Sequence, residues 1–294
     1  MMKSMVTIVI PAYNEENAII DTISELRQVL DDKVSETGVL QYEIIIVNDG
    51  SSDSTREKAE AAGVRVINHP HNIGYGRSLK DGIQNAGFDT IVITDADRTY
   101  PLQEIPNLLK EYQQGFDMVV GARTGKHYRE SLLKSPLRSI LKFLVEFTAG
   151  RQVPDVNSGL RIFSKATIIP YLNHLCDTFS FTTSLTLAYM MTGRFVKYLE
   201  IPYDKREGKS KVKLFRDSLR TLQYILQAIN YYNPIKLFIL FSAVCVFFAM
   251  IGFLMSAIFG LNSGFYLGIG GLLVALLVVC FGLIADLLKQ IMNK

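Results

Sequence analysis

The stretch Thr90-Ile91-Val92-Ile93-Thr94 runs directly into Asp95-Ala96-Asp97, and this joint between an apolar run and two acids decides the fold. The run is short and rich in β-branched residues, which predicts a buried strand. Further runs of this kind lie at 6–11, 43–47, 64–68 and 118–121 and alternate with helical patterns at 15–30, 54–62, 76–85 and 102–112. This alternation predicts an α/β fold with a mostly parallel sheet and helices on both faces.

Polar residues follow the predicted strands, and ligands bind beyond the carboxyl ends of strands in such sheets. Asp95 and Asp97 stand one residue apart, so both carboxylates can approach one divalent cation, and oxygen ligands suit Mg²⁺ or Mn²⁺. An acidic surface turn is the alternative, because a pair of acids is a weak signal by itself. The hydrophobic strand just before the pair favours metal binding.

Two earlier strands also end in polar segments. The first runs into Pro11-Ala12-Tyr13-Asn14-Glu15-Glu16, where we expect Asn14 to cap a helix that begins at Glu15. The second runs into Asn48-Asp49-Gly50-Ser51-Ser52-Asp53, where Gly50 permits a tight turn and the acids can accept hydrogen bonds from a ribose or base. Turn and cap chemistry alone is the alternative explanation of both segments.

These three segments, in this order, resemble family 2 glycosyltransferases of the GT-A (Rossmann-like) fold, and most of all the dolichyl- or polyprenyl-phosphate sugar synthases. Further matches are Gly121-Ala122-Arg123, Asn157-Ser158-Gly159-Leu160-Arg161 and Gly208-Lys209-Ser210-Lys211. The resemblance covers about residues 6 to 213. It implies an enzyme that moves a sugar from a nucleotide diphosphate donor onto a dolichyl or undecaprenyl phosphate. We expect inversion at the anomeric carbon and favour a UDP-sugar over a GDP-sugar, although the residues do not distinguish uracil from guanine.

The resemblance assigns a nucleotide-sugar site. A glycine-bearing loop after the third strand adds Asn72 and Arg77, unless that loop is only a flexible connection. The site comprises Pro11, Tyr13, Glu15, Asp49, Asn72, Arg77, Asp95, Ala96, Asp97, Lys205, Arg206 and Lys211. The metal ligands would be Asp95, Asp97 and Thr99, although the family commonly has Gln where Thr99 stands. The basic loop 205–211 would close over the diphosphate; its alternative role is contact with anionic lipid headgroups.

The acceptor phosphate needs cations near the reacting sugar. Arg123 follows the fifth strand, and Lys134, Arg138 and Lys142 form a basic stripe on a helix predicted over 131–147. Arg138 and Lys142 match the phosphate-binding pair of the resembled family. A solvated helix face is the alternative for the stripe. Asp155 would orient the acceptor or the sugar, unless it is only a cap. The expected catalytic set is therefore Asp95, Asp97, Arg123 and Asp155.

The end of the chain has a different composition. Two apolar runs, at 235–259 and 265–288, each reach the ~20 residues that a membrane-spanning helix needs. An amphipathic helix over 215–230 precedes them and suits the membrane interface. We therefore expect a cytosolic GT-A catalytic domain at 1–213, an interfacial helix at 214–233 and a transmembrane hairpin at 234–294. Basic residues flank the hairpin but are missing from its turn, which places both termini in the cytoplasm. A prokaryotic cell membrane is the favoured location.

Composition excludes several other functions. A net charge of only +3 argues against a nucleic-acid binder, and the three cysteines match no metal or redox spacing. A processive polysaccharide synthase shares the acidic motifs, but it uses a Gln-x-x-Arg-Trp motif and this chain has no tryptophan. A non-catalytic membrane scaffold is the third possibility, opposed by the intact acidic pair and basic loop. Analogy with the family adds a homo-oligomer assembled through the membrane helices.

Overall fold

A computed structural model describes residues 4–32, 39–125, 135–203 and 214–292. The chain divides into two compact units, Met1–Tyr224 and Ile225–Lys294. The division falls within one helix, α9 (Leu214–Tyr232), which covers the segment that we expected to lie at a membrane interface. The domain limits predicted from the sequence stay predictions.

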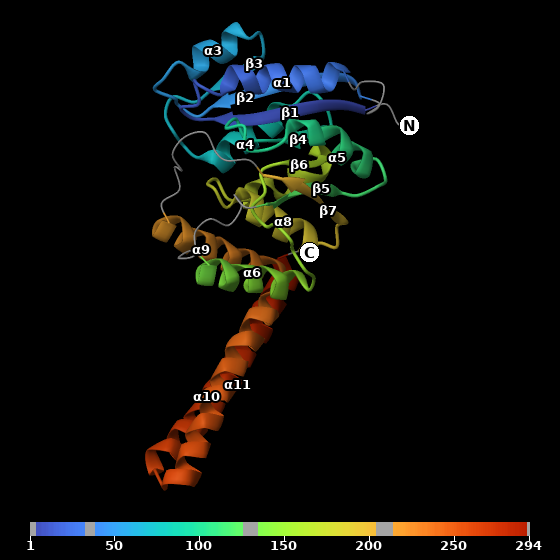
Figure 1. Ribbon diagram of the computed structural model, residues 1–294. Coiled ribbons are helices and arrows are strands. Elements are labelled where there is room, and N and C mark those ends of the chain that lie inside the picture. Colours follow the sequence, from blue (N-terminus) through green and yellow to red (C-terminus); the bar gives the residue numbers. More distant parts are fainter. Residues whose placement is uncertain (1–3, 33–38, 126–134, 204–213, 293–294) are drawn as a thin grey trace. The chain divides into compact units, whose positions relative to one another are not determined.

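Within the described part of the first unit, seven strands form one sheet in the order β3-β2-β1-β4-β6-β5-β7 (Figure 1). The strands are β1 (Ser4–Ala12), β2 (Val39–Asn48), β3 (Arg65–Asn68), β4 (Thr90–Ile93), β5 (Met118–Thr124), β6 (Arg161–Ser164) and β7 (Val196–Pro202). All neighbouring pairs are parallel except those of β6, which runs antiparallel to β4 and to β5. The mostly parallel sheet predicted from the sequence is confirmed.

Helices connect these strands. Those of the first unit are α1 (Ile19–Asp32), α3 (Thr55–Ala61), α4 (Tyr75–Asn85), η1 (Leu102–Glu104), α5 (Ile105–Tyr112), α6 (Ser135–Ala149), α7 (Lys165–Ile168), η4 (Ile169–His174) and α8 (Phe181–Met191). The helix after β1 begins at Ile19, four residues later than the sequence predicted, because the segment that leaves β1 bonds to another loop, as described below.

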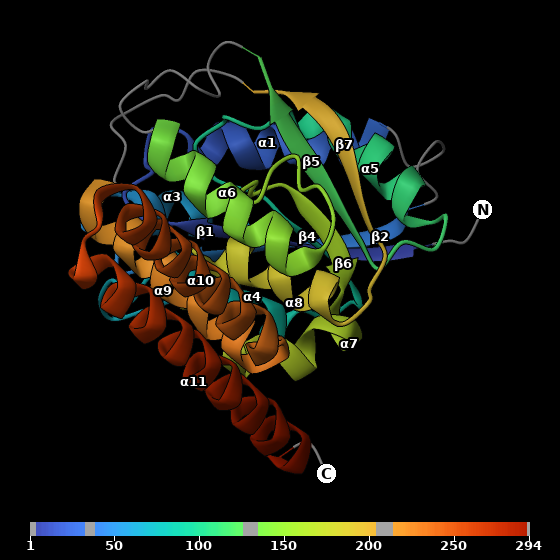
Figure 2. The same ribbon diagram turned by 90° about the horizontal axis from the view of Figure 1, so that it is seen from below.

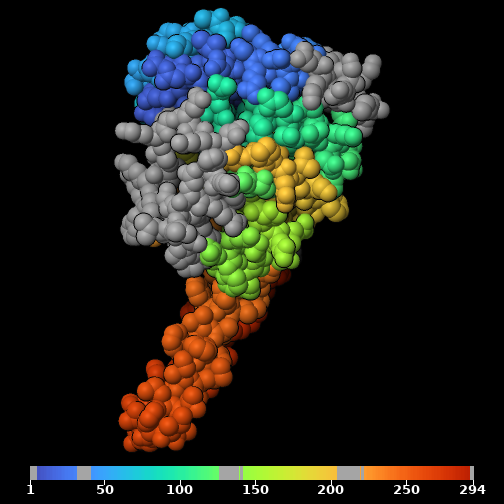
Figure 3. Space-filling view, in the orientation of Figure 1, coloured from blue at the N-terminus to red at the C-terminus, as the bar shows by residue number. Residues whose placement is uncertain are grey.

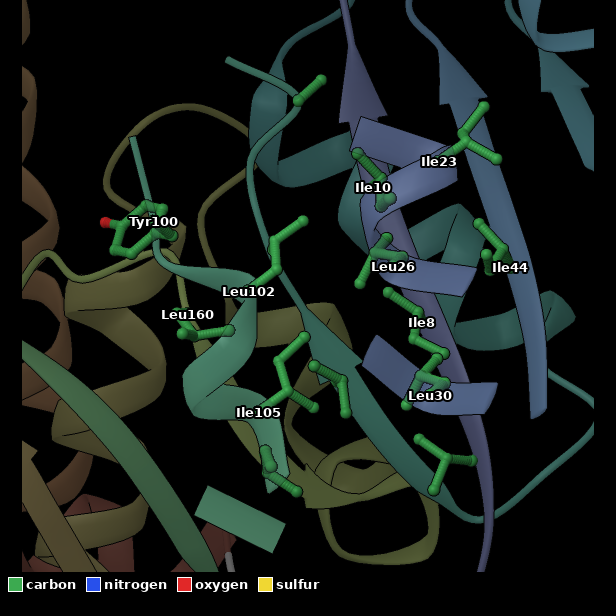
Figure 4. Close-up of a cluster of buried hydrophobic side chains, with 14 of the residues drawn as sticks. Ile8, Ile10, Ile23, Leu26, Leu30, Ile44, Tyr100, Leu102, Ile105 and Leu160 are labelled. Atoms are coloured by element: carbon green, nitrogen blue, oxygen red, sulfur yellow. The ribbon is translucent and has the colours of Figure 1, made fainter. Parts of the chain in front are cut away.

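A buried hydrophobic core lies on the face of the sheet covered by α1 and α5 (Figure 4). Alternate residues of β1 point into it, as the period of a strand requires, and the apolar stripe of α1 packs against them. Its members from these two elements are Val6, Ile8, Ile10, Ala12, Ile19, Ile23, Leu26 and Leu30. Tyr100, Leu102 and Leu160 extend this core toward the loops that follow β4 and precede β6.

The opposite face is covered by α4 and α8. The backbone of α4 approaches the sheet so closely that a Cβ on Gly82 would lie 2.3 Å from Val9 Cγ1. The helix α8 is buried along almost its whole length, because α4 and α6 also pack against it. These layers fix the ends of the strands, where the predicted site residues lie.

The region between β5 and β7 was not predicted. β6 lies antiparallel between β4 and β5, and β7 is the outermost strand, next to β5 (Figure 2). Since β6 is antiparallel, its amino end lies at the same end of the sheet as the carboxyl ends of β4 and β5. Residues just before Arg161 are therefore brought to the ends of those two strands.

The second unit contains α10 (Pro234–Phe259) and α11 (Asn262–Met292), which lie side by side as a helical hairpin (Figures 1 and 3). Both are long and apolar enough to cross a membrane, and only 11% and 17% of their most apolar windows are buried. Glycines allow the close approach: a Cβ on Gly252 would lie 2.8 Å from the Gly264 carbonyl oxygen.

Two adjacent glycines of α11 give a matched test of this packing. A Cβ on Gly271 would lie 2.8 Å from Ala249 Cβ, whereas one on Gly270 would meet nothing within 4 Å. We expect Gly271→Leu to weaken the hairpin by about 1–3 kcal/mol through overpacking and Gly270→Leu to leave it unchanged. The measurement is energy transfer between fluorophores on α10 and α11 during an SDS titration of the full chain. Equal midpoints for the two variants would contradict the packing.

Candidate functional site

The predicted site residues lie at one end of the sheet, where β1, β2, β4 and β5 end and the antiparallel β6 begins. Tyr13 follows β1, Asp49 follows β2, the Asp95–Asp97 pair follows β4, and Arg123 stands near the end of β5. The segment 155–159 reaches the same end because β6 begins there. The topology therefore brings together residues that lie more than a hundred positions apart in the sequence.

The loops after β1 and β2 are bonded to each other. The Asn14 amide donates to the Ser51 hydroxyl at 3.0 Å, and Asn14 Oδ1 accepts from the Ser52 amide at 2.9 Å. The Glu15 amide donates to the Thr55 hydroxyl at 2.8 Å. Asn14 takes a left-handed conformation, with φ +53°, to make these contacts. The predicted helix cap at Asn14 is thus wrong: its side chain joins two loops, and Pro11, Tyr13 and Glu15 lie half-buried beside that joint.

Asp53 closes the second of these loops. Burial alone would raise its pKa, but hydrogen bonds from the Thr55 hydroxyl and amide and from the Glu16 amide outweigh burial and lower the pKa below its usual value. The Asp53 carboxylate therefore stays ionised and holds the start of α3. This agrees with the turn-and-cap explanation of the segment.

Asp49 organises the loop after β3. Its carboxylate lies 2.9 Å from His69 Nδ1 and accepts the amides of Ile73 and Gly74 at 3.0 and 2.9 Å. Asp49 is only 3% exposed, so these bonds fix the loop that carries Asn72. Asn72 itself is exposed.

Arg77 lies one turn into α4 and is half exposed. Its Nε is 2.9 Å from Asp81 Oδ2 on the same helix, an ion pair that holds the side chain along the helix surface. Its predicted part in nucleotide binding is untested by this contact.

The acidic pair after β4 is held from several sides. Asp97 is 5% exposed and accepts the Thr99 hydroxyl at 2.6 Å and the Thr99 amide at 3.2 Å. Asp95 Oδ1 accepts the Tyr75 hydroxyl at 2.9 Å. The Ala96 carbonyl between them accepts the Thr22 hydroxyl of α1 at 3.1 Å. The turn that carries both carboxylates is therefore fixed before any ligand arrives.

The carboxylate oxygens of Asp95 and Asp97 suit a cation that is also bound by a substrate. Mg²⁺ and related ions are commonly held by one or two carboxylates together with substrate phosphates, without an all-protein cage. Among the described residues, no group of three or more His, Cys, Asp and Glu side chains could hold a metal ion. Asp95 and Asp97 supply the two-carboxylate arrangement. The Thr99 hydroxyl supports Asp97, and its place as a third ligand stays a prediction.

Arg123 and Asp155 form a bidentate pair. Arg123 Nε and Nη2 lie 2.7 and 2.9 Å from the two Asp155 oxygens, and the Arg123 amide donates to the same carboxylate at 3.1 Å. Burial would raise the pKa of Asp155, but the bonds and charge of Arg123 outweigh burial and lower it. The Arg123 guanidinium also lies over the Tyr203 ring, 5.3 Å from its centroid. The two predicted residues therefore act as one unit.

Arg161 is a residue to which the sequence analysis gave no role. It is fully buried, and its guanidinium donates to the Ser158 and Val156 carbonyls at 2.8 and 2.7 Å and to the Thr186 hydroxyl at 2.8 Å. Burial lowers its pKa below the usual value. Arg161 thus shapes the segment between Asp155 and Gly159. In the sequence, Arg161 was only the last residue of the matching segment Asn157–Arg161. It begins β6, a strand that was not predicted.

Most of the predicted basic residues lie outside the part of the chain that the structure describes. Lys134, Lys205, Arg206 and Lys211 lie outside the described residues, as does the side chain of Arg138 on α6. Lys142 is described: its Nζ lies 3.7 Å from Glu146 Oε1 on the same helix, and its side chain is 44% exposed. The assignment of these residues stays a prediction.

With this geometry in view, the chain was compared with known proteins. Residues 7–171 match the family model described as glycosyl transferase family 2. An undecaprenyl-phosphate 4-deoxy-4-formamido-L-arabinose transferase of Klebsiella pneumoniae is 30% identical over 255 residues, which cover 84% of this chain and 73% of that protein. The chain belongs to glycosyl transferase family 2.

One further relative and one solved structure are similar to this family 2 glycosyltransferase. A dolichyl-phosphate beta-glucosyltransferase of Trichomonas vaginalis is 28% identical over 224 residues, covering 71% of this chain and 66% of that protein. A solved glucosyl-3-phosphoglycerate synthase of Mycobacterium tuberculosis, in complex with Mn²⁺, UDP and phosphoglyceric acid, matches with a TM-score of 0.59 at 20% identity. That match covers 76% of this chain and 78% of the synthase, and it confirms the predicted fold.

The Arg123–Asp155 pair of this glycosyltransferase yields a test with a defined pH dependence. Arg123→Met leaves a carboxylate that is 2% exposed without its cation, and we expect a loss of about 3 kcal/mol of stability at pH 7. The double variant Arg123→Met with Asp155→Asn should recover most of that loss, because no buried charge then remains unpaired. Thermal unfolding of the full chain in detergent measures both.

The lowered pKa of Asp155 fixes the sign of the pH effect. A depressed carboxyl pKa adds stability that is fully present above the ordinary value of about 4 and is lost as pH falls through the folded value. The difference between wild type and Arg123→Met should therefore shrink below about pH 4. A gap that is as wide at pH 3 as at pH 7 would show that the pair does not supply the stability.

Proposed function

We propose that this glycosyltransferase transfers a sugar from a nucleotide diphosphate donor to a polyprenyl phosphate, with inversion and with a divalent cation. The observation that carries the proposal is the 84% of the chain that aligns with an undecaprenyl-phosphate sugar transferase. This alignment reaches far beyond the segment shared by the whole family, and the site's acids occur within it.

The donor half rests on the carboxyl ends of the strands. Asp49 and the Asp95–Asp97 pair follow the carboxyl ends of β2 and β4, which lie on either side of β1, and α/β proteins bind ligands at such ends. Mg²⁺ or Mn²⁺ at Asp95 and Asp97 would neutralise charge on the donor diphosphate as it leaves. The solved synthase of this fold is a complex with Mn²⁺ and UDP, and we favour a UDP-sugar here.

The acceptor half rests on cations and on the hairpin. Arg123 stands at the ends of the strands, and Asp155 fixes its guanidinium plane by accepting from Nε and Nη2. We place it near the acceptor phosphate, to which a guanidinium can donate further N–H bonds. Lys134, Arg138 and Lys142 would add charge from the segment around α6. We also propose that α10 and α11 cross the membrane, with the catalytic unit and both termini in the cytoplasm.

The reaction needs no strong base. A phosphate monoester is already an anion near neutral pH, so its oxygen can attack the anomeric carbon while the bond to the diphosphate breaks on the opposite side. The residues of the chain then act by positioning and by stabilising charge. Asp155 would orient Arg123, and Lys205, Arg206 and Lys211 would cover the diphosphate.

The lipid product tests the proposal directly. Membranes that contain the full chain are given radiolabelled UDP- and GDP-sugars, undecaprenyl or dolichyl phosphate and Mn²⁺, and the lipid fraction is counted. We expect label in lipid with one donor, its loss on chelation, and a fall of at least about 100-fold for Asp97→Asn. Asp21→Asn, an exposed acid on α1, is the matched control and should keep wild-type activity.

Two outcomes would overturn parts of the proposal. Unlabelled lipid with every donor and both acceptors would exclude this transfer, and label in a polymer would favour the processive synthase instead. Full activity of Asp97→Asn would exclude the metal assignment and leave the rest of the proposal in place.

A further inference from the structure

Tyr75 reaches the acidic pair from the glycine-bearing loop after the third strand, where the sequence analysis gave it no role. It is the first residue of α4, and its hydroxyl donates to Asp95 Oδ1 at 2.9 Å. The two residues are 20 positions apart and come from different elements. Asp95 therefore has one of its oxygens bonded to a side chain of the α4 segment.

The backbone of Tyr75 is fixed on both sides. Before it, Gly74 has φ +123°, a conformation that suits only glycine, and its amide donates to Asp49 at 2.9 Å. After it, the Arg77 amide donates to the Asp177 carbonyl at 2.9 Å. The position of the phenol is thus set by the chain on either side of it.

The ring of Tyr75 is also held. Phe179 stacks on it, with the centroids 5.9 Å apart and the planes at 11°. The stacking keeps the hydroxyl directed at the Asp95 carboxylate, to which it donates.

The other side of Asp95 is bounded by backbone. A Cβ on Gly159 would lie 2.9 Å from Asp95 Oδ2 and 3.0 Å from Oδ1, so the carboxylate rests against the glycine. Between the phenol and the glycine, the rotamer of Asp95 is fixed. A fixed carboxylate binds a cation with less loss of side-chain entropy than a mobile one.

We propose that Tyr75 is a positioning residue that holds the Asp95 carboxylate in the orientation in which it binds the donor's divalent cation. Through Gly74 it also joins Asp95 to Asp49, so that the two ends of the nucleotide site are set by one segment. This inference rests on the proposed function, because it takes Asp95 as a cation ligand.

The test compares Tyr75→Phe with Tyr171→Phe in the full chain. Each variant removes one phenol hydroxyl, and that of Tyr171 bonds to Thr192 outside the site. Mn²⁺ binding is measured by electron paramagnetic resonance with UDP or GDP present, and nucleotide binding is measured separately without metal. For Tyr75→Phe we expect the Mn²⁺ dissociation constant to rise about three- to tenfold, as the loss of one ordinary hydrogen bond predicts. Metal-free nucleotide binding and the melting temperature should hardly change.

Kinetics supply a second readout if the lipid product is formed. The Mn²⁺ concentration for half-maximal activity should rise in Tyr75→Phe, while kcat at saturating Mn²⁺ stays close to wild type. Tyr171→Phe should match wild type in every measurement.

The outcomes separate the two proposals. If wild type and Tyr75→Phe bind Mn²⁺ equally well, Tyr75 does not position Asp95 and only this inference fails. If Tyr75→Phe also weakens metal-free nucleotide binding as strongly as Mn²⁺ binding and lowers the melting temperature, the role of Tyr75 is merely structural. That result would also overturn the inference. If wild type binds no Mn²⁺ with either nucleotide, the metal-dependent function itself fails.

Discussion

The guanidinium of Arg161 lies fully buried under the segment that enters β6, and the placement of the site depends on it. Removing this charge from water costs several kcal/mol, and only well-placed acceptors offset that cost. Its acceptors are the Val156 and Ser158 carbonyls and the Thr186 hydroxyl, all neutral oxygens. Because these bonds must be kept, the backbone from 156 to 158 has one conformation, and the residues on either side of it have fixed positions.

Those flanking residues build one side of the site. Asp155, on one flank, takes the fork of Arg123, and Gly159, on the other, lies against Asp95 and bonds through its amide to the Tyr100 hydroxyl at 2.6 Å. The opposite side is built by Asp49 through the loop that ends in Gly74 and Tyr75. The two sides meet at Asp95. Asp95, one of the pair predicted to bind a metal, is thus held from both sides.

The sequence predicted those parts of the fold that local patterns determine. Short apolar runs rich in β-branched residues predicted β1, β2, β3, β4 and β5, and two long apolar runs predicted α10 and α11. β6 has four residues and begins with Arg161, so it carries no such pattern, and its antiparallel direction depends on contacts with β4 and β5. Asn14 was read as a helix cap because the residue type allows it, while its actual partner is Ser52 in another loop. Tyr75 escaped notice for the same reason: Asp95 lies 20 positions away.

The negative charge of the site means that a donor diphosphate needs additional positive charge in order to bind there. Asp49, Asp95 and Asp97 each bring a negative charge to the ends of the strands, and the charge of Arg123 is matched by Asp155. The buried Arg161 contributes one positive charge, which leaves the carboxylates in excess. A donor diphosphate brought to this site would add at least two further negative charges, and in a partly desolvated site like charges repel strongly. Neutralisation therefore requires positive charge from elsewhere. In the proposed function, a divalent cation at Asp95 and Asp97 would supply part of it, and Lys205, Arg206 and Lys211 would supply the rest. The carboxylates would then disfavour a diphosphate that arrives alone and favour one that arrives with its metal.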